Sequence, residues 1–431
     1  MSSLVWFRND LRVHDNASLM QACQDDTVVA IYCIDPAAFK KGPFGFKKME
    51  RYRGKFLLET LEILQNNLAK LHITLLVYHK SAQQIIPEVI QKYKLQKVYL
   101  QQEWTRDEHL ELEQVKQRVP ASISFIESFD QFLCHPDDIP YEGISQIPQV
   151  FTPFRKKCEL HCPIRPSIPV PEKKAPSNLL DYQTLVPTLE DLGFEAFEIH
   201  PHTAFPFKGG EDAAMERIRE YFWATKKIAY YKKTRNGLLG TNYSSKLSAW
   251  LANGSLSARQ VFWELKKFEE TVIKNEDTYW LFFELLWRDY FKYISMKFGN
   301  KIFLQGGILN KTYDWEDSEK AKNSWIHGYT EEPFVNANMK ELALTGWMSN
   351  RGRQNVASYW AKELRQDWRI GAGYFEAMLI DYDVHSNWGN WMYNSGVGND
   401  PRDRKFNIKR QAEQYDGDGK FQRLWLQDTL F

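Results

Sequence analysis

A run of hydroxyl and basic side chains in the second half of the chain has the composition of a phosphate-binding helix N-terminus. It reads Ser-Ser-Lys-Leu-Ser over residues 244–248 and precedes a helix-forming segment that stops at Asn253 and Gly254. Serine is a good N-cap, and the free N–H groups and dipole of a helix N-terminus favour an anion such as a pyrophosphate. The run therefore predicts a helix that begins at Ser244 or Ser245. Because serine caps are common, an ordinary helix start is the simpler interpretation of this run alone.

A second segment combines aromatic rings with a carboxylate. On a helix, the 4, 3 and 4 spacing of Trp280, Glu284, Trp287 and Phe291 places them on one face. A carboxylate buried among aromatic rings is costly unless it is paired. Two interpretations remain open. In one, Glu284 forms an ion pair with Arg288 one turn away; in the other, Trp287 stacks a planar substrate and Glu284 hydrogen-bonds it.

Two further segments, at 345–354 and 381–394, place polar residues between aromatic ones. They read Thr-Gly-Trp-Met-Ser-Asn-Arg-Gly-Arg-Gln and Asp-Tyr-Asp-Val-His-Ser-Asn-Trp-Gly-Asn-Trp-Met-Tyr-Asn. A few polar groups among aromatic walls are typical of a cofactor pocket. Chance recurrence of all four segments, in order, within one half of the chain is improbable.

The elements that must position these side chains differ between the two halves of the chain. Residues 1–130 alternate short β-rich runs with amphipathic stretches, which predicts an open, doubly wound parallel sheet. The strand-like runs are 4–7, 28–33, 73–78, 98–100 and 123–126, and the amphipathic stretches include 52–68 and 107–118. Neither a glycine-rich dinucleotide fingerprint nor a P-loop pattern occurs, so this half lacks the usual phosphate-cradling loops.

Residues 131–205 contain many of the prolines of the chain, which disfavours long helices there. We interpret this segment as a linker over the surface and not as a third domain. Residues 206–431 place Trp, Tyr and Phe mainly at helical spacing. The predicted fold is an N-terminal doubly wound α/β domain joined by a long linker to an all-α C-terminal domain.

Length, composition and charge limit the class of protein to which the chain can belong. At 431 residues, with 43% hydrophobic residues, the chain can form two domains. Its 56 Lys and Arg balance 55 Asp and Glu, so no overall positive field marks a nucleic-acid binder, although a local basic face stays open. The most apolar stretch, 279–296, carries four charged residues and does not predict a membrane span.

The cysteines and the N-terminus bear on compartment and metal binding. The five cysteines are scattered, which fits a reducing compartment better than a disulfide framework. Cys158, His161 and Cys162 form the only cluster and lack a fourth ligand at a suitable spacing, so no metal site is expected. The N-terminal residues resemble neither a signal peptide nor a transit peptide, and we expect a cytoplasmic protein.

Together with residues 4–16, the four segments resemble the photolyase/cryptochrome superfamily. Residues 4–16 read Leu-Val-Trp-Phe-Arg-Asn-Asp-Leu-Arg-Val-His-Asp-Asn. Residues 386–391, Ser-Asn-Trp-Gly-Asn-Trp, and 398–402, Gly-Asn-Asp-Pro-Arg, most resemble its cryptochrome-DASH branch. The resemblance covers essentially the whole chain and implies FAD in the helical half. Because the chain ends soon after Leu426, we expect no long C-terminal tail of the kind that signalling cryptochromes carry.

The resemblance implies how the flavin is held. Arg353 would pair with Asp381 against the isoalloxazine edge, and Asn387 would face flavin N5. A neutral amide hydrogen-bonds N5 without imposing acid chemistry, which suits a fully reduced anionic flavin that Arg353 helps to stabilise. The other implied FAD contacts are Tyr231, Ser244, Ser245, Lys246, Leu247, Ser248, Arg288, Asn350 and Asp383.

The resemblance also implies an electron chain of three tryptophans. Trp391 would lie nearest the flavin, Trp368 in the middle and Trp315 at the surface. Core packing would explain any one of them, whereas three at the matching positions favour electron transfer.

The implied reaction is light-driven splitting of a cyclobutane pyrimidine dimer that is flipped into a pocket over the flavin. Glu284 would hydrogen-bond the dimer, Trp287 would stack against it, and Asn350 would line the pocket. Gln354 and Tyr393 stand where duplex-repair enzymes have Met and Trp. Contacts with these two side chains should offset less of the free energy that extruding a dimer from DNA costs. Because extrusion costs least from single strands, single-stranded DNA is the expected partner, with RNA as an alternative.

An antenna chromophore, 5,10-methenyltetrahydrofolate, is implied between the two domains. Glu103 stands at the position of the family's folate-contacting glutamate, and a solvated carboxylate at a helix start is the alternative. Trp104 is larger than the small aliphatic residue expected beside it.

Two functions from different classes stay open. The first is a repair lyase, and the second is a blue-light sensor that binds DNA, RNA or a protein and signals through the redox state of its flavin. A dark flavin oxidoreductase is less well supported because no nicotinamide site is evident. No obligate protein partner is evident either.

Overall fold

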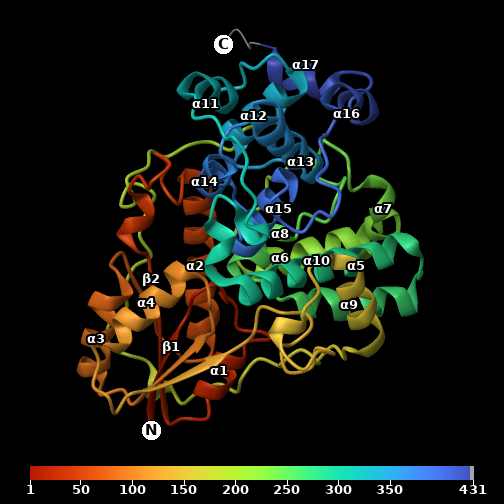
Figure 1. Cartoon of the computed structure of the whole chain (residues 1–431). Coiled ribbons are helices and arrows are strands. Elements are labelled where there is room, and N and C mark those ends of the chain that lie inside the picture. The colour runs from red at the N-terminus through yellow and green to blue at the C-terminus, as the bar shows by residue number, and fades with distance from the viewer. Residues whose placement is uncertain (428–431) are drawn as a thin grey trace.

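The computed structural model describes residues 1–427. Its N-terminal half contains a parallel sheet of five strands in the order β3-β2-β1-β4-β5 (Figure 1). The strands are β1 Ser2–Trp6, β2 Thr27–Cys33, β3 Leu75–Tyr78, β4 Lys97–Gln101 and β5 Ser124–Ser128. All five predicted strands are present. β1 lies in the middle, with Val5 opposite Ala30 of β2 and Tyr99 of β4.

Helices cover both faces of this sheet. They are α1 Ala17–Ala22, α2 Arg51–Lys70, α3 Ala82–Tyr93 and α4 Arg106–Lys116. Because successive strand residues point to opposite faces, Val5 packs in one core with Leu61 of α2, whereas Leu4 packs in a second core with Ile86 of α3. The amphipathic stretches predicted at 52–68 and 107–118 correspond to α2 and α4. The doubly wound α/β architecture is confirmed.

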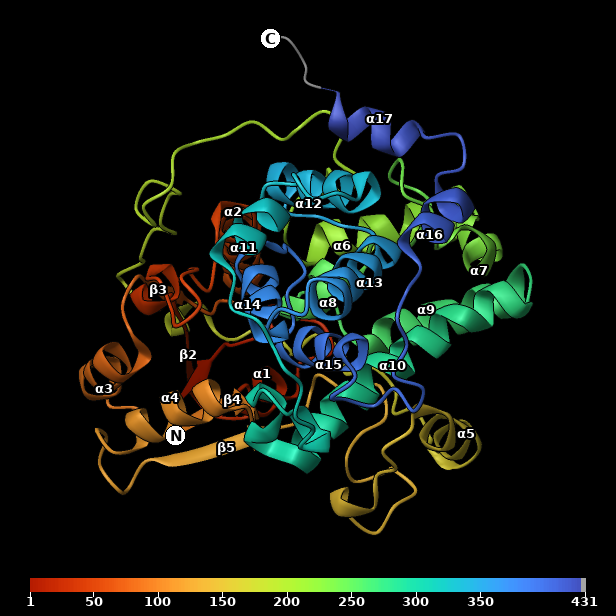
Figure 2. The same ribbon diagram turned by 45° about the horizontal axis from the view of Figure 1, so that its top comes forward.

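The proline-rich segment between the halves contains a helix that the sequence did not predict. Helix α5, Phe151–His161, has 11 residues. Pro153 does not break it because this proline stands in the first turn, where its backbone N–H is not needed. Phe132 and Phe154 from this segment are buried in the core of the helical half. By contrast, residues 163–205 run as an extended yellow-green trace along the outside of the molecule (Figure 2).

The second half of the chain is helical, as predicted. Its helices are α6 Glu211–Ile218, α7 Tyr231–Thr234, α8 Ser248–Asn253, α9 Ala258–Thr271, α10 Glu276–Phe298, α11 Glu319–Ile326, α12 Pro333–Thr345, α13 Asn350–Ser358, α14 Trp368–Met378, α15 Val384–Ser395, α16 Ile408–Tyr415 and α17 Lys420–Leu426. Asn275 and Thr278 form a reciprocal capping box that starts the 23-residue α10. This helix packs against α5, α7 and α15, and so lies at the centre of the helical half (Figure 1).

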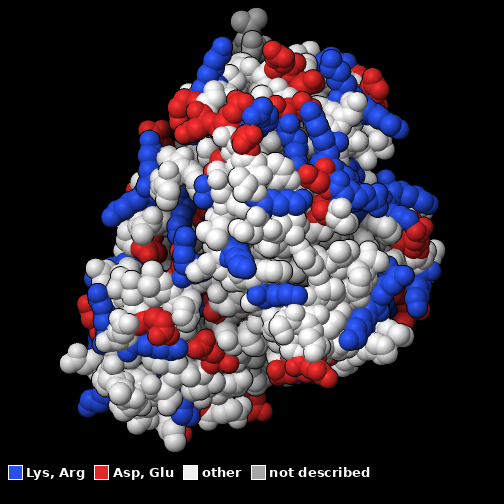
Figure 3. All heavy atoms as spheres, in the orientation of Figure 1, with Lys and Arg blue, Asp and Glu red and all other residues white. Residues whose placement is uncertain are grey.

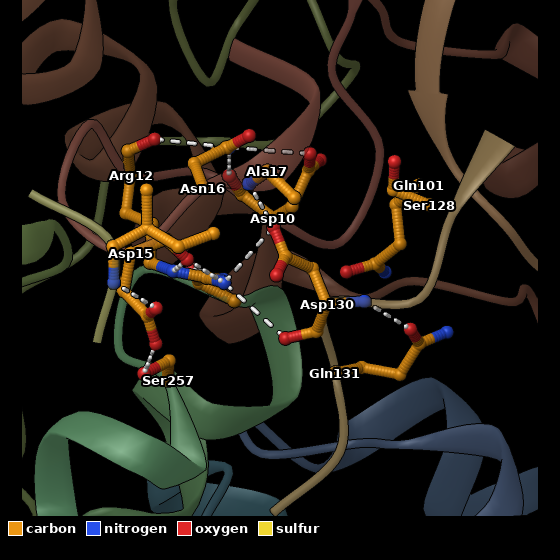
Figure 4. Close-up of polar contacts among 12 residues, drawn as sticks. Asp10, Arg12, Asp15, Asn16, Ala17, Gln101, Ser128, Asp130, Gln131 and Ser257 are labelled. Atoms are coloured by element: carbon orange, nitrogen blue, oxygen red, sulfur yellow. Dashed lines mark hydrogen bonds and ion pairs between the residues drawn. The ribbon is translucent and has the colours of Figure 1, made fainter. Parts of the chain in front are cut away.

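A buried ionic cluster joins the two halves. Arg259 of α9 donates hydrogen bonds of 2.7 Å to both Asp15 and Asp130, and Ser257 contacts the same Asp15 carboxylate. Arg12 lies 3.7 Å from Asp130, and these charged side chains are at most 5% exposed. Figure 4 shows Arg12, Asp15, Asp130 and Ser257 converging from the two halves. Because a buried charge without its partner is strongly unfavourable, the cluster fixes the halves relative to each other.

Candidate functional site

The segments identified from the sequence meet at a cavity of about 250 Å³ in the helical half. A smaller cavity of about 80 Å³ adjoins it and shares Asn350, Arg353, Asp381 and Asp383 with it. Asn387 lines the smaller cavity. The other residues implied to contact FAD line the larger one: Tyr231, Ser244, Ser245, Lys246, Leu247, Ser248 and Arg288. The structure thus brings all of these residues together around one site.

The hydroxyl run forms a loop before the helix and not the first turn of the helix. Helix α8 begins at Ser248, so the predicted helix start at Ser244 or Ser245 is wrong. The carbonyls of these two serines accept hydrogen bonds of 3.1 and 2.9 Å from the buried Arg217 of α6, which hold the loop outside the helix. Sequence reasoning missed Arg217 because no local pattern connects it with a loop 27 residues further along the chain.

The backbone of this loop has the shape of an anion site. Lys246 is left-handed, with φ of 63°, and Leu247 follows with φ of −75° and ψ of −10°. Adjacent left- and right-handed residues turn successive N–H groups toward one point and form an anion-binding nest. The N–H groups in the first turn of α8 also have no intrahelical partners. The loop therefore fits the pyrophosphate of FAD through its main chain.

Lys246 adds a buried amine to the same wall. Its Nζ has no hydrogen-bond partner among residues 1–427, and it lies over the rings of Tyr243 at 3.2 Å and Trp347 at 4.8 Å. Burial lowers the pKa of Lys246 well below its usual value, and burial raises the pKa of its neighbour Glu341 to about 8. An anion at the loop would favour the charged ammonium, so Lys246 fits a phosphate-bearing cofactor.

Arg353 of α13 and Asp381 form the ion pair that the resemblance implied. One guanidinium nitrogen lies 2.9 and 3.0 Å from the two carboxylate oxygens, and Nε donates to the Met348 carbonyl at 2.9 Å. Ser248 donates to the same carboxylate at 2.6 Å. The Asp381 side chain is 3% exposed and that of Arg353 is 25% exposed. The pair therefore holds a cation on the wall common to both cavities.

Asp383 positions helix α15, which carries Asn387. As the N-cap, its carboxylate accepts a hydrogen bond of 2.7 Å from the Ser386 N–H, and it pairs with Lys292 of α10 at 3.1 Å. Burial alone would raise the pKa of Asp383, but the Lys292 ammonium holds it well below its usual range. One turn further on, the Asn387 amide donates to the Ala372 carbonyl at 3.0 Å. This bond fixes the amide at the wall of the smaller cavity.

Glu284 lines the larger cavity and pairs with Arg235. The interpretation of Glu284 and Arg288 as an ion pair along α10 is therefore wrong. Arg288 instead donates to the main-chain carbonyls of Leu251, at 3.0 Å, and Gln131. Burial raises the pKa of Glu284, and the Arg235 guanidinium opposes that shift. Sequence reasoning missed Arg235 because it lies 49 residues away from Glu284 in the chain.

Trp287 and Tyr393, the aromatic residues expected to hold a base, are not among the residues that line either cavity. Trp287 stacks on Phe151 of α5, with ring centroids 3.7 Å apart and 17° between planes. The ring of Tyr393 meets Trp287 edge-on at 6.0 Å. Gln354 lines the smaller cavity, where its Oε1 accepts a hydrogen bond of 2.9 Å from Arg351. One face of Trp287 is thus already covered by a ring that sequence reasoning did not identify.

The three tryptophans of the implied electron chain occupy different environments. Trp391 is 2% exposed and lines the smaller cavity. Trp368 is fully buried, and its indole N–H donates to the Gln305 carbonyl at 2.9 Å. Trp315 is half-buried and packs against Tyr313 at 5.2 Å. One predicted electron donor therefore stands at the cavity wall, one in the core and one near the surface.

Glu103 lines a third cavity, of about 120 Å³, between the two halves. Helix α4 begins at Arg106 and Glu103 is 5% exposed, so the interpretation as a solvated carboxylate at a helix start is wrong. Gln101 Nε2 donates to the Glu103 carboxylate at 2.8 Å. Gln101 Oε1 and Arg53 Nε, from two residues that line the same cavity, are buried without partners among residues 1–427. These groups fit a polar ligand such as a pterin.

Trp104 lies next to Glu103 without lining that cavity. Its ring stacks on His385 at 4.7 Å and on Phe132 at 5.4 Å. Its indole N–H donates to the Ser295 hydroxyl at 2.8 Å. The space for this large side chain is therefore provided by the packing between the halves and not by the cavity.

Two features are absent from residues 1–427. No group of His, Cys, Asp and Glu side chains there is arranged to hold a metal ion. In the same part of the chain, no helix combines the length and apolar character that crossing a membrane requires.

Comparisons with known proteins agree with this geometry. Residues 3–176 match the family model of DNA photolyase, and residues 280–429 match that of the FAD binding domain of DNA photolyase. The Cryptochrome DASH of Gloeobacter violaceus is 46% identical over 427 residues, which are 98% of this chain and 85% of that protein. The crystal structure of a Synechocystis sp. cryptochrome matches with a TM-score of 0.94 and 42% identity, over 99% of this chain and 88% of that chain.

The fold and the site together define a blue-light flavoprotein of the DNA photolyase class. Within that class, the chain belongs to the cryptochrome DASH family.

Proposed function

We propose that this protein is a light-driven lyase that splits cyclobutane pyrimidine dimers, preferentially in single-stranded DNA, with reduced FAD as electron donor. One observation carries the proposal. Glu284 lines the same cavity as the phosphate-binding loop and Arg353. A base that hydrogen-bonds Glu284 would therefore lie against the cofactor, where an electron can pass between them over a short distance.

The residues of the two adjoining cavities would hold and orient FAD. When bound, this cofactor supplies the light absorption and the transferred electron. The N–H groups of Lys246 and Leu247 would bind its pyrophosphate, and Arg353 would oppose the negative charge of the reduced ring. Asn387 would hydrogen-bond N5 without acting as an acid. The protein thus contributes binding, orientation and electrostatic stabilisation.

The aromatic surroundings support a preference for single strands. Glu284 and Asn350 would orient the dimer by hydrogen bonds at the pocket rim. Stacking on an aromatic side chain returns about 1–3 kcal/mol per base, but one face of Trp287 is covered by Phe151. With Tyr393 edge-on beside it, the pocket offers little further stacking to offset the few kcal/mol that extrusion from a duplex costs.

Basic side chains beside the substrate residues support a nucleic-acid partner. In Figure 3, Lys and Arg side chains are spread over the whole face in view with Asp and Glu among them, and the middle of that face has more basic than acidic side chains. Three arginines contact proposed substrate residues: Arg235 contacts Glu284, Arg351 contacts Gln354 and Arg404 contacts Tyr393. Guanidinium groups in these positions suit the phosphates of a bound strand.

Trp391, Trp368 and Trp315 would return electrons to the flavin in steps. Trp391 borders the flavin cavity, and the carbonyl that accepts the Trp368 N–H stabilises positive charge on that indole. Trp315 is partly exposed, so an external reductant such as a thiol can refill the chain there.

The third cavity would hold 5,10-methenyltetrahydrofolate as an antenna. Glu103, with the unpartnered polar atoms of Gln101 and Arg53, would hydrogen-bond the pterin ring. Arg288 and Asp383 line both this cavity and the flavin cavity. The two chromophores would therefore lie close enough for efficient energy transfer.

A cytoplasmic location is part of the proposal, because all five cysteines are free. A relative from Arabidopsis thaliana, 42% identical, is named chloroplastic/mitochondrial. Imaging of the tagged full-length protein in its native cell separates the two locations.

A second candidate is a blue-light photoreceptor that binds DNA or RNA and repairs little. The coverage of Trp287 by Phe151 favours it, because a weakly stacking pocket binds a flipped dimer weakly. The two candidates differ in what illumination does to a damaged oligonucleotide.

The deciding experiment starts with the absorption spectrum of the purified protein. Flavin bands together with a near-ultraviolet folate band support the binding of both chromophores. The reduced protein is then illuminated with a single-stranded oligonucleotide that carries one thymine dimer, beside a dark control. Restored thymines support the lyase, whereas flavin photoreduction without repair supports the photoreceptor.

A further inference from the structure

Trp391 contacts a tryptophan that the predicted electron chain does not include. The ring centroid of Trp325, in α11, lies 6.1 Å from that of Trp391, with 74° between planes. Trp360 lies 4.8 Å beyond Trp325, at 37°. Trp325 and Trp360 are both fully buried. A contiguous path of three indoles thus leads from the wall of the flavin cavity into the core.

The geometry of Trp325 and Trp360 suits a shared positive charge. Two indoles this close can share the charge left by the loss of one electron, which makes that loss easier than from a single ring. The Trp360 N–H donates to the Asp367 carbonyl at 2.9 Å, and the dipole of that carbonyl favours a positive ring. Phe375 and Tyr374 surround Trp325 at 6.4 and 5.8 Å, and the negative faces of aromatic rings attract cations.

The predicted route through Trp368 ends near the surface, whereas the pair of Trp325 and Trp360 does not reach it. Trp315, at the end of that route, is half-buried and reaches the surface, so an external donor can refill it. Trp325 and Trp360 have no exposed surface. An external reductant therefore cannot reach a charge that resides on them.

We propose that Trp325 and Trp360 form a second, closed branch of the electron chain, which exchanges an electron with Trp391 and competes with Trp368. The proposal rests on the light-driven electron transfer proposed above. Trp391 loses one electron to the photoexcited oxidised flavin and becomes a radical cation. Trp325 then gives one electron to Trp391, and the positive charge is shared between Trp325 and Trp360.

No proton leaves the pair in this exchange. The Trp325 N–H has no hydrogen-bond partner among residues 1–427, and the partner of the Trp360 N–H is a carbonyl, which is too weak a base to take the proton. The charge therefore returns by the same path, through Trp391. The branch holds the charge next to the flavin and lowers the yield of photoreduction by external thiols.

Transient absorption of the oxidised holoprotein tests the branch. The comparison is between Trp368→Phe, which closes the predicted route, and the double variant Trp368→Phe/Trp325→Phe. We expect a long-lived indole radical cation in the first and its loss in the second. Trp325→Phe alone should raise the yield of thiol-dependent photoreduction. Trp425→Phe, a buried tryptophan of α17, is the matched control and should leave both signals unchanged.

Equal decay of the radical cation in the single and double variants would overturn the branch. Trp391→Phe separates this failure from failure of the proposed function, because persistence of both signals in that variant would refute the whole tryptophan chain. Flavin content and circular dichroism establish that each variant is folded. If Trp325→Phe loses its flavin, Trp360→Phe breaks the same pair, and an unchanged radical lifetime in the Trp368→Phe background would then overturn the branch.

Discussion

Replacing Arg353 by methionine removes the cation on the wall that the two adjoining cavities share. The guanidinium makes contacts of 2.9 and 3.0 Å with Asp381, whose side chain is 3% exposed. Breaking a buried ion pair by removal of one partner costs about 3–5 kcal/mol. Because the Arg353 side chain is 25% exposed, we expect the lower end of that range. Urea denaturation of the Arg353→Met apoprotein should show a free energy of unfolding lower by about 3 kcal/mol.

The same change should weaken FAD binding, because methionine offers an anionic cofactor neither a charge nor a hydrogen-bond donor. A hydrogen bond to a charged group contributes about 1.5–3 kcal/mol, which corresponds to an increase in Kd of about 10- to 150-fold. Quenching of flavin fluorescence during titration of the apoprotein measures this Kd.

Two control variants separate the effect of this cation from a general effect of losing an arginine. Arg353→Lys keeps the charge and should fall between wild type and Arg353→Met. Arg365→Met removes an arginine that is 57% exposed and lies 3.6 Å from Glu316, and a surface change of this kind should stay within about 0.5 kcal/mol. A wild-type Kd for FAD in Arg353→Met would refute the placement of the cofactor against this cation.

Three further predictions concern other buried charges. Glu284→Gln replaces the charged acceptor that is proposed to hydrogen-bond the dimer by a neutral amide, so a dimer-containing single strand should bind about tenfold more weakly, a loss of about 1.4 kcal/mol; fluorescence anisotropy measures it, and unchanged binding would contradict the role of Glu284. Arg259→Met leaves Asp15 unpaired and should lower the free energy of unfolding by about 3–5 kcal/mol in urea, whereas a loss below about 1 kcal/mol would show that the ionic cluster contributes little. Burial raises the pKa of Glu341 from 4.5 to about 8, so unfolding releases its proton between those pH values and the wild type loses stability as pH rises through that window. Glu341→Gln should therefore gain stability relative to wild type across the same window, and a pH-independent difference in urea denaturation would contradict this.

The sheet was predictable because its signal is local. Each strand is a short apolar run between polar turns, and a buried parallel strand needs no partner information to be recognised. The prolines of residues 131–205 hide helix α5 from a prediction by sequence, because proline disfavours a helix interior, whereas Pro153 occupies a first-turn position that tolerates it.

Sequence reasoning could predict most of the residues that gather at the two cavities, but not the contacts that these residues make. The residues implied to contact FAD came from the resemblance, and the structure brings them to two adjoining cavities. The start of α8 and the partner of Glu284 were wrong because Arg217 and Arg235 act from distant parts of the chain. Contacts between segments of this kind depend on tertiary packing, which no local pattern records. The same holds for Phe151, which covers one face of Trp287.

Photorepair of one thymine dimer in two contexts tests the central claim most directly. The reduced holoprotein is illuminated with the same damaged oligonucleotide as a single strand and annealed to its complement, and restored thymines are counted per absorbed photon. We predict efficient repair of the single strand and much weaker repair of the duplex, with Glu284→Gln impaired on both. Equal repair of the two substrates would contradict the single-strand preference, and flavin photoreduction with no repair of either would contradict the lyase itself.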